Sequence, residues 1–333
     1  MKTPGYLVRV ASLAAGLTLA AAAATASPAA AAATHYSGTL ADGATWIADV
    51  PSGWNGVLLL YSHGFGPLTA ADAPDPASAA ALLGRGYALA GSSYDPNGSW
   101  WALQSAVRDQ FQTIDAATAN ALPHAPSRVI AVGSSMGGLI SALEAQQGAG
   151  HINGALSTCG IVAGGIRLNN YQLDGEYVMA KLLATAPIQL VHFFPDFNAG
   201  IATGFELQAI ANQAQTTPQG RARLELAMAF LNTTPDAPGS APPSFWDADG
   251  VEAAQFASEF TGGFPIIAFV NAARPWIEMS AGGNASWTKG ENFALLLAHA
   301  PYAFTGARLY QEAGLNLFSD LAALNAGANI PAD

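Results

Sequence analysis

The chain has 333 residues, with 12 Lys and Arg against 23 Asp and Glu, and a formal net charge of −11. An acidic chain of this kind argues against binding to nucleic acid or to an anionic membrane, so neither partner is expected. The length is sufficient for one large domain, or for a core with an insertion.

The first 33 residues have the layout of a secretory signal peptide. Lys2 and Arg9 form a short basic start, an apolar run covers residues 10–24, and small residues continue to Ala33. This order of regions is typical of a signal peptide, and the apolar run is too short and too rich in Ala for a membrane span. We expect export, with cleavage after Ala26 or Ala33. Removing the two positive charges from −11 leaves a mature charge of −13.

Between residues 34 and 165, predicted strands alternate with predicted helices. Strands are expected at 45–50, 57–61, 87–92, 128–132 and 154–158, and helices at 76–84, 103–122 and 137–147. Alternation of this kind produces a mostly parallel sheet with helices on both faces. The sequence therefore predicts an α/β core over residues 34–165.

From residue 166 onward this alternation ends and helical patterns follow one another. Helices are expected at 177–184, 204–215, 219–231, 251–260 and 305–323, joined by loops rich in Pro, Gly, Asn and Asp. We interpret residues 166–333 as a mainly helical cap that follows a core strand.

The strongest chemical motif is a strand that runs into Gly-x-Ser-x-Gly and then into a helix. The apolar residues 129–132 precede Gly133, Ser135 and Gly137, and a helical pattern follows. A serine on such a sharp turn projects its Oγ away from the sheet, and the flanking glycines avoid collisions with the neighbouring backbone. The pattern predicts Ser135 as a nucleophile, because this kind of turn places its central residue at the apex.

A second apolar strand, residues 57–61, ends in a Gly-rich turn that contains His63, Gly64 and Phe65. A tetrahedral intermediate needs two N–H donors directed at its developing oxyanion. One donor comes from the residue after the nucleophile, here Met136, and the other from this loop, where we expect the N–H of Phe65. His63 is expected to shape the loop, since the base of such a site follows the nucleophile along the chain.

These two strand-end motifs resemble the α/β-hydrolase superfamily. A narrower similarity, to secreted bacterial esterases and peptidases with a helical cap, rests on the segments 63–66, 84–88, 133–138, 154–160 and 283–287. The resemblance implies a serine hydrolase in which the cap follows the sixth strand and the last two core strands follow the cap. It also implies a catalytic acid after the seventh strand and a histidine after the eighth.

The acid and the histidine are not identifiable by the expected signals after Ser135. The candidates are Glu278, after the apolar run 264–270, and His299, after the run 293–298. These runs are either two strands that end at an acid and a base, or two apolar helices. The alternative is a chain that stops at Asp333 before the last core strands. A disulfide partner for Cys159 in that missing part fits this alternative, although a lone Cys is more commonly a buried apolar residue.

The substrate pocket is expected after the fourth strand, where Tyr94, Trp100 and Trp101 supply apolar or aromatic walls, although these rings fit ordinary packing under the cap equally well. The sequence has no metal cluster, dinucleotide motif or phosphate loop, so neither a cofactor nor a metal is expected.

The sequence therefore predicts a secreted carboxylic-ester hydrolase that forms an acyl-enzyme on Ser135, with a small-molecule or polymeric ester as substrate. A serine exopeptidase and a catalytically incomplete binding protein of the same fold remain as alternatives. The oligomeric state is open.

Overall fold

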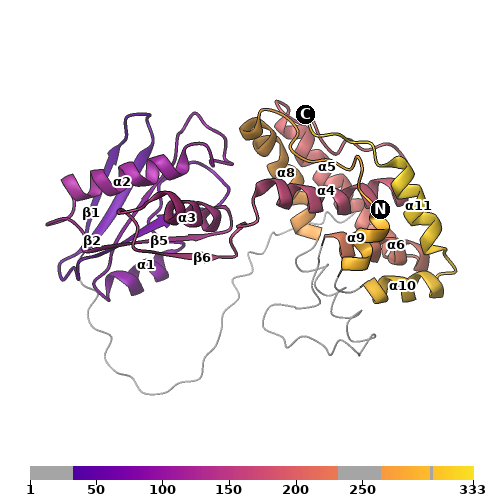
Figure 1. Ribbon diagram of the computed structural model, residues 1–333, viewed down its shortest axis with the longest axis horizontal. Coiled ribbons are helices and arrows are strands. Elements are labelled where there is room, and N and C mark those ends of the chain that lie inside the picture. The colour runs from indigo at the N-terminus through magenta and orange to yellow at the C-terminus, as the bar shows by residue number, and fades with distance from the viewer. Residues whose placement is uncertain (1–32, 232–263, 301–302) are drawn as a thin grey trace, which may run out of the picture.

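The computed structural model describes residues 33–231, 264–300 and 303–333. Its first part, at the left of Figure 1, is a six-stranded sheet in the order β1-β2-β4-β3-β5-β6. The strands are β1 (Ala33–Thr39), β2 (Thr45–Pro51), β3 (Val57–Ser62), β4 (Ala88–Ser92), β5 (Arg128–Ser134) and β6 (Gly154–Thr158). The helices between them are α1 (Pro76–Leu83), α2 (Ala106–Asn120) and α3 (Met136–Gln147).

Strand pairing confirms the predicted α/β fold with a mostly parallel sheet. The neighbours β4, β3, β5 and β6 are parallel to one another, whereas β1 pairs with β2 and β2 with β4 in antiparallel fashion. All five predicted strands are present, and β1 is an additional strand that the sequence pattern did not predict. Because parallel strands point the same way, the ends of β3, β4 and β5 lie at one edge of the sheet.

Alternate side chains of β3 are buried, which places Leu58, Leu60 and Ser62 on the same face. Leu58 and Leu60 join an apolar cluster with Ile114 and Ala117 of α2. Each fully buried Leu contributes about 1.5–3 kcal/mol through the area that it removes from water. The cluster therefore fixes α2 on the strands that end at the predicted site.

After β6, every described element is a helix. These are α4 (Gly165–Leu182), α5 (Phe197–Ala214), α6 (Pro218–Phe230), α8 (Phe264–Ala281), α9 (Phe293–His299), α10 (Ala303–Glu312) and α11 (Leu317–Gly327). They form the separate helical group at the right of Figure 1, with their own apolar core.

The structure differs from the sequence predictions for two apolar runs and for one long helix, and it does not describe two other predicted segments. The runs 264–270 and 293–298 belong to the helices α8 and α9, so their interpretation as strands is wrong. The single helix expected at 305–323 is two helices, because Gly314 adopts φ 68° and ends the first of them. The helix expected at 251–260 lies outside the described residues, as does nearly all of the predicted signal peptide.

Helix α8 joins the helical part to the sheet. Ala273 and Ile277 of α8 belong to one apolar cluster with Trp101 and with Met136 of α3. The hydroxyl of Ser99 also donates to the backbone carbonyl of Trp276. The predicted site therefore lies next to the contact between the two parts of the chain.

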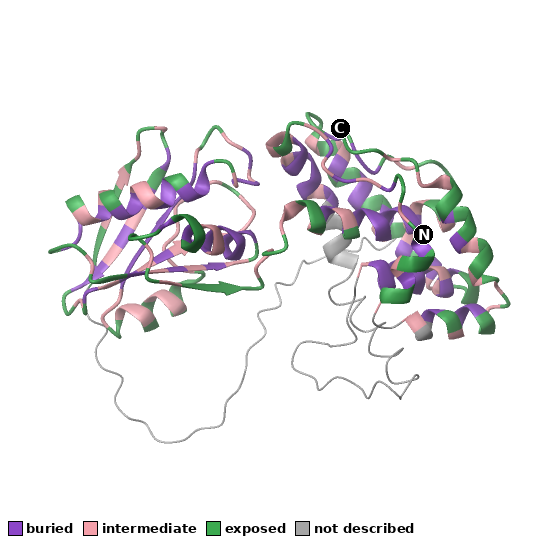
Figure 2. Cartoon of the chain, viewed as in Figure 1, coloured by how far each residue is buried: buried purple, intermediate pink, exposed green. Residues whose placement is uncertain are grey.

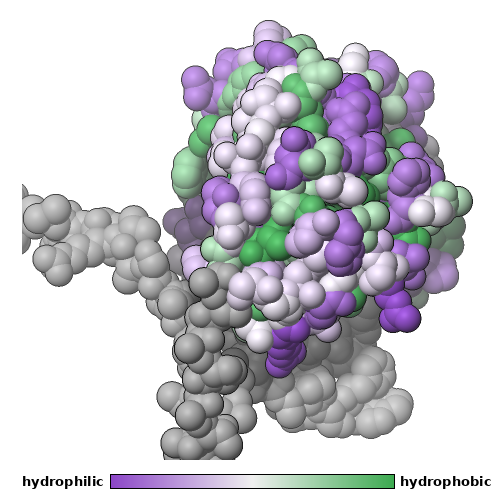
Figure 3. All heavy atoms as spheres, turned by 90° about the vertical axis from the view of Figure 1, so that its left-hand side faces the viewer, coloured by the Kyte–Doolittle hydropathy of each residue, from purple (hydrophilic) through white to green (hydrophobic). Residues whose placement is uncertain are grey.

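Exposure differs sharply between the strands of the sheet. β4 is buried along its whole length, whereas four of the five residues of β6 are exposed, as the green β6 in Figure 2 shows. Among the described residues, the large exposed apolar side chains lie from Leu156 onward. Figure 3 shows the molecule from the left-hand side of Figure 1, the side of the sheet, and on this face hydrophobic residues are interspersed with hydrophilic ones. Within the described ranges no helix is long and apolar enough to cross a membrane.

Candidate active site

Ser135 occupies a strained turn between β5 and α3. Its backbone has φ 57° and ψ −125°, a region that residues with side chains rarely adopt. The side chain is exposed, whereas the next six residues of α3 are buried. Its N–H donates to the carbonyl oxygen of Thr158 at 3.1 Å, which ties the turn to the end of β6. The turn therefore presents the Ser135 hydroxyl to solvent at the edge of the sheet.

The glycines on either side of Ser135 are required by close backbone contacts. A Cβ atom on Gly133 would overlap the carbonyl group of Gly137. A Cβ atom on Gly137 would overlap the carbonyl group of Ser62, at the end of β3. This geometry is that of a nucleophile elbow, and it brings the ends of β5 and β3 together.

The two predicted oxyanion donors lie on the segments that this contact joins. Met136 is the first residue of α3, and an N–H in the first turn of a helix has no partner within the helix. The loop after β3 reaches Ser135 as well, because a Cβ atom on Gly64 would lie 3.6 Å from the Cβ of Ser135. The peptide N–H of Phe65 follows directly. The structure thus brings Ser135, Met136 and the 63–65 loop together, next to the positive end of the α3 dipole.

His63 supports this loop. Its Nδ1 lies 2.8 Å from the carbonyl oxygen of Gly64, and its ring stacks on Tyr94 with the centroids 4.2 Å apart. Burial lowers the pKa of His63, so the imidazole is neutral at pH 7. A neutral ring held at Nδ1 and stacked on one face is suited to shaping the loop.

Tyr94 was predicted to line the substrate pocket, but it is fully buried. Its hydroxyl donates to the carbonyl oxygen of His63 at 3.1 Å. Tyr94 therefore supports the 63–65 loop through its contacts with His63 and does not line an accessible substrate pocket.

The predicted pocket residues Trp100 and Trp101 lie between the loop and α8. The ring of Trp100 is stacked on Trp276, with the centroids 4.6 Å apart and the planes at 3°, and its other neighbour is Phe65 at 6.1 Å. Trp101 lines a pocket of about 270 Å³ together with Ile277 of α8. The sequence did not predict Trp276, because only folding brings α8 to this place.

The structure does not bring Glu278 together with His299. The buried Glu278 carboxylate accepts three backbone N–H groups, from His192 at 2.7 Å, Phe193 at 2.6 Å and Phe194 at 2.9 Å. His299 is exposed at the end of α9. The predicted acid and base depended on two strands that end near the nucleophile, and both segments are helices.

All six histidines of the chain fall within the described residues, and none is hydrogen-bonded to Ser135. His35 binds Asp49, His63 binds Gly64, His124 stacks on Trp54, His151 lies against Phe111, His192 lies near Asp333, and His299 is exposed. The described contacts therefore bring together the predicted nucleophile and the predicted oxyanion donors without a histidine bonded to Ser135.

Cys159 directly follows β6 and is exposed with a free thiol, so the interpretation as a buried apolar residue is wrong. No group of three or more His, Cys, Asp or Glu in the described residues is arranged to hold a metal ion.

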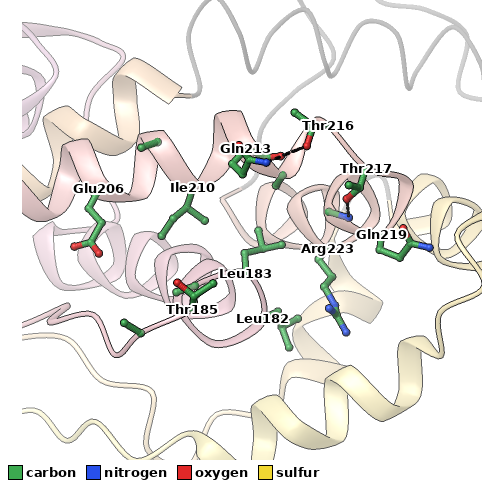
Figure 4. A pocket seen from close by; sticks show the side chains of 15 residues that line it. Leu182, Leu183, Thr185, Glu206, Ile210, Gln213, Thr216, Thr217, Gln219 and Arg223 are labelled. Atoms are coloured by element: carbon green, nitrogen blue, oxygen red, sulfur yellow. Dashed lines mark hydrogen bonds between the residues drawn. The ribbon is translucent and has the colours of Figure 1, made fainter.

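A pocket of about 530 Å³ lies among the ends of α4, α5 and α6, as Figure 4 shows. It is lined by no residue before Leu182, so it is separate from the Ser135 site.

Comparison with known proteins gives distant similarities. The sequence matches no known family profile. It is 26% identical, over an alignment of 325 residues, to an o-phthalyl amidase from Xanthobacter agilis, with 90% of this chain and 69% of the amidase covered.

Two solved structures are similar at low identity. An esterase from Pyrococcus furiosus is 15% identical, with 55% of this chain and 66% of that chain covered and a TM-score of 0.34. Brefeldin A esterase, a bacterial homologue of human hormone-sensitive lipase, is 14% identical, with 92% and 76% covered and a TM-score of 0.35. The chain thus spans only about two thirds of the amidase and of the Pyrococcus esterase. At these values no residue role is transferred, and the fold rests on the sheet and the elbow described above. The chain has an α/β fold with a mostly parallel sheet and a nucleophile-elbow turn at Ser135, and it is similar to an amidase and to two esterases.

Proposed function

We propose that the chain is a serine hydrolase that cleaves carboxylic esters through an acyl-enzyme on Ser135. The observation that carries the proposal is the backbone of Ser135, at φ 57° and ψ −125°, between a buried strand and a helix N-terminus. Strain of this kind persists where the surrounding structure enforces it, and it is common at catalytic residues. An exposed hydroxyl above two oxyanion donors is suited to attack on a carbonyl carbon.

In the proposed reaction the Oγ of Ser135 attacks the ester carbonyl as its proton passes to a base. The carbonyl oxygen becomes an oxyanion that accepts hydrogen bonds from the N–H groups of Met136 and Phe65. The intermediate collapses, the C–O bond to the alcohol breaks, and the alcohol leaves with a proton. Water then attacks the acyl-enzyme and releases the acid, which regenerates the Ser135 hydroxyl.

Amide cleavage is the second candidate, and the similarity to an amidase favours it. The same acyl-enzyme serves esters, amides and the peptide bonds of an exopeptidase, and only the leaving group differs. The absence of a histidine bonded to Ser135 in turn favours a binding protein on the same scaffold.

The aromatic rings beside the loop support an aromatic group in the substrate. Phe65, Trp100 and Trp276 are partly exposed, and the ring of Trp100 lies next to both of the others. Trp101 lines the adjacent pocket of about 270 Å³. Flat rings bind by offset stacking or edge contacts to such surfaces. We propose aryl esters as the preferred small-molecule substrates.

The test is labelling by a fluorophosphonate probe, which reacts with activated serine nucleophiles. Wild type and S134A are expected to label, and S135A is expected to lose the label. Ser134 is the matched control, because it is the adjacent hydroxyl at the end of β5. A folded wild type that fails to label contradicts the enzyme proposal and supports the binding protein. Among labelled proteins, hydrolysis of a short-chain p-nitrophenyl ester against an aryl anilide and an aminoacyl anilide separates esterase, amidase and exopeptidase.

We further propose that the protein is exported, on the basis of the charged, apolar and small-residue order in residues 1–33. N-terminal sequencing of the protein from the culture medium tests this, with a start after Ala26 or Ala33 as the expected result. Protein that stays in the cells with residues 1–33 attached contradicts it.

A further inference from the structure

A buried polar cluster lies at the end of β3, where the 63–65 loop begins. It consists of Glu144 on α3, Ser62 at the end of β3 and Gln110 on α2, and we call these residues the Glu144 network. None of the three side chains has any exposed surface. The proposed reaction uses none of them, so their burial calls for another explanation.

Glu144 lies where the pattern of α3 calls for an apolar residue. Met136, Ile140 and Glu144 are spaced four residues apart and lie on the same buried face of the helix. Met136 and Ile140 belong to an apolar cluster, and Glu144 continues that face as a carboxyl group. Burying a carboxyl group costs free energy, so packing alone does not account for it.

Hydrogen bonds connect the network to both neighbouring strands. Ser62 Oγ donates to Glu144 Oε1 at 2.7 Å. Gln110 Nε2 donates to Ser62 Oγ and to the carbonyl oxygen of Tyr61, both at 2.7 Å. Gln110 Oε1 accepts the N–H of Ser92 at 3.2 Å, at the end of β4. The ends of β3 and β4 are thereby fixed to α2 and α3.

The position of Ser62 links this network to the reaction. Ser62 immediately precedes His63 and Gly64, so it is the base of the loop that carries the N–H of Phe65. Glu144 lies on the helix whose first residue, Met136, carries the other donor. The bond between Ser62 and Glu144 therefore joins the segments that hold the two oxyanion donors.

Burial of Glu144 favours its neutral carboxyl group, whereas the bond from Ser62 favours its carboxylate. Burial is the larger effect and raises the pKa of Glu144 to about 8. Glu144 Oε2 has no hydrogen-bond partner among the described residues, so an ionised carboxylate would be poorly compensated. The other ionisable groups nearby are Tyr94, whose own pKa is raised by burial and by the charge of Glu144, and His63 above it. Neither supplies a cation at pH 7 or above.

We infer that Glu144 is a positioning residue, which accepts the hydroxyl of Ser62 and so sets the spacing of the Phe65 and Met136 N–H groups around the oxyanion. This inference rests on the proposed function for its effect on catalysis. The structural part, a loop held through the bond between Ser62 and Glu144, does not depend on turnover.

The activity test compares E144Q, E144L and the control S141A at pH 7. Ser141 is also buried on α3 and donates only to the carbonyl oxygen of Gly138 in its own helix, so S141A removes a buried polar group without touching the loop. E144Q retains an acceptor for the Ser62 hydroxyl. We expect E144Q and S141A to match the kcat of wild type.

E144L removes the acceptor while keeping an apolar volume. We expect it to fold with an unfolding midpoint equal to or above that of wild type, because an apolar residue replaces a buried carboxyl group. Its kcat is expected to fall by about 10- to 100-fold with KM changed by less than about threefold, as for a weakened oxyanion hole. A folded E144L with the kcat of wild type, or an E144Q whose kcat falls as far as that of E144L, overturns the inference.

A second measurement does not need turnover. Amide hydrogen exchange of residues 63–66 is compared among wild type, E144L and S141A at pH 7. We expect faster exchange in E144L alone, because it lacks the acceptor for Ser62. If this difference appears without Ser135 labelling, the positioning role stands and the enzyme proposal fails. If labelling and turnover are present but exchange is equal in the three proteins, the positioning role fails alone.

Discussion

Gly137, in the first turn of α3, lies so close to the carbonyl group of Ser62 that it has no room for a Cβ atom. This contact closes the space between the nucleophile turn and the loop after β3. The elbow thus depends on two backbones that meet directly, and the adjacent Gly133 shows the same dependence against the carbonyl group of Gly137.

The first prediction follows from this contact. G137A is expected to lower the free energy of unfolding by about 1–3 kcal/mol, as overpacking of a close-packed interior does, and to lower labelling of Ser135. The matched control is G53A, because no atom lies within 4 Å of a Cβ at that position. Denaturant unfolding of both variants tests this. A G137A protein as stable and as reactive as G53A would contradict the contact.

The core was predictable from the sequence because its signals are local. Apolar runs bounded by turns predicted β2 to β6, and the strand-turn-helix order around Ser135 predicted the elbow. β1 was missed because its residues are mostly exposed and lack an apolar face. The run 264–270 was ambiguous, since a short apolar run is compatible with either a strand or a helix.

The surroundings of the site were less predictable, because tertiary contacts create them. Trp276 reaches Trp100 only through the packing of α8, about 175 residues further along the chain. Glu144 was not singled out, although its spacing from Met136 and Ile140 placed an acid on an apolar helix face. That spacing was the available signal.

The second prediction concerns the acid and base considered from the sequence. E278A is expected to lower the free energy of unfolding by on the order of 3 kcal/mol, because it leaves three N–H groups, that of Phe193 buried and those of His192 and Phe194 partly buried, without their acceptor. E206A, at an exposed position of α5, is the control and is expected to change stability little.

H299A is expected to keep both the stability and the Ser135 labelling of wild type, because His299 is exposed and bonded to neither Ser135 nor Glu278. Loss of labelling in a folded H299A protein would instead support the catalytic pairing of Glu278 with His299.

The third prediction concerns the aromatic rings next to the loop. W276L is expected to raise KM for a p-nitrophenyl ester of an aromatic acid by about 2- to 10-fold, since stacking on an aromatic side chain contributes about 0.5–1.5 kcal/mol. KM for the corresponding acetate is expected to change much less. The control is F318L, which removes an aromatic ring that is 79% exposed on α11. Equal changes in KM for both esters in W276L would exclude an aromatic subsite at Trp276.

The last prediction is that the stability of the folded protein depends on pH through Asp72, which lies near Asp49 of β2. Burial raises the pKa of Asp72 to about 6, and the carboxylate of Asp49 adds to this rise. Asp49 itself is held 2.7 Å from His35. Because the folded protein binds the Asp72 proton more tightly than the unfolded chain does, this stabilisation is complete below about pH 4 and is lost as the pH rises through 6.

D72N has no proton to lose at this position. We therefore expect its melting temperature to exceed that of wild type at pH 7.5 and to approach it at pH 4. The control D115N removes the charge of an exposed carboxylate on α2 and is expected to show no such difference between the two pH values. Thermal unfolding at both pH values measures this. A gain in D72N that is equal at pH 4 and 7.5 would show that Asp72 is destabilising through its packing, and that the proximity of Asp49 has no role.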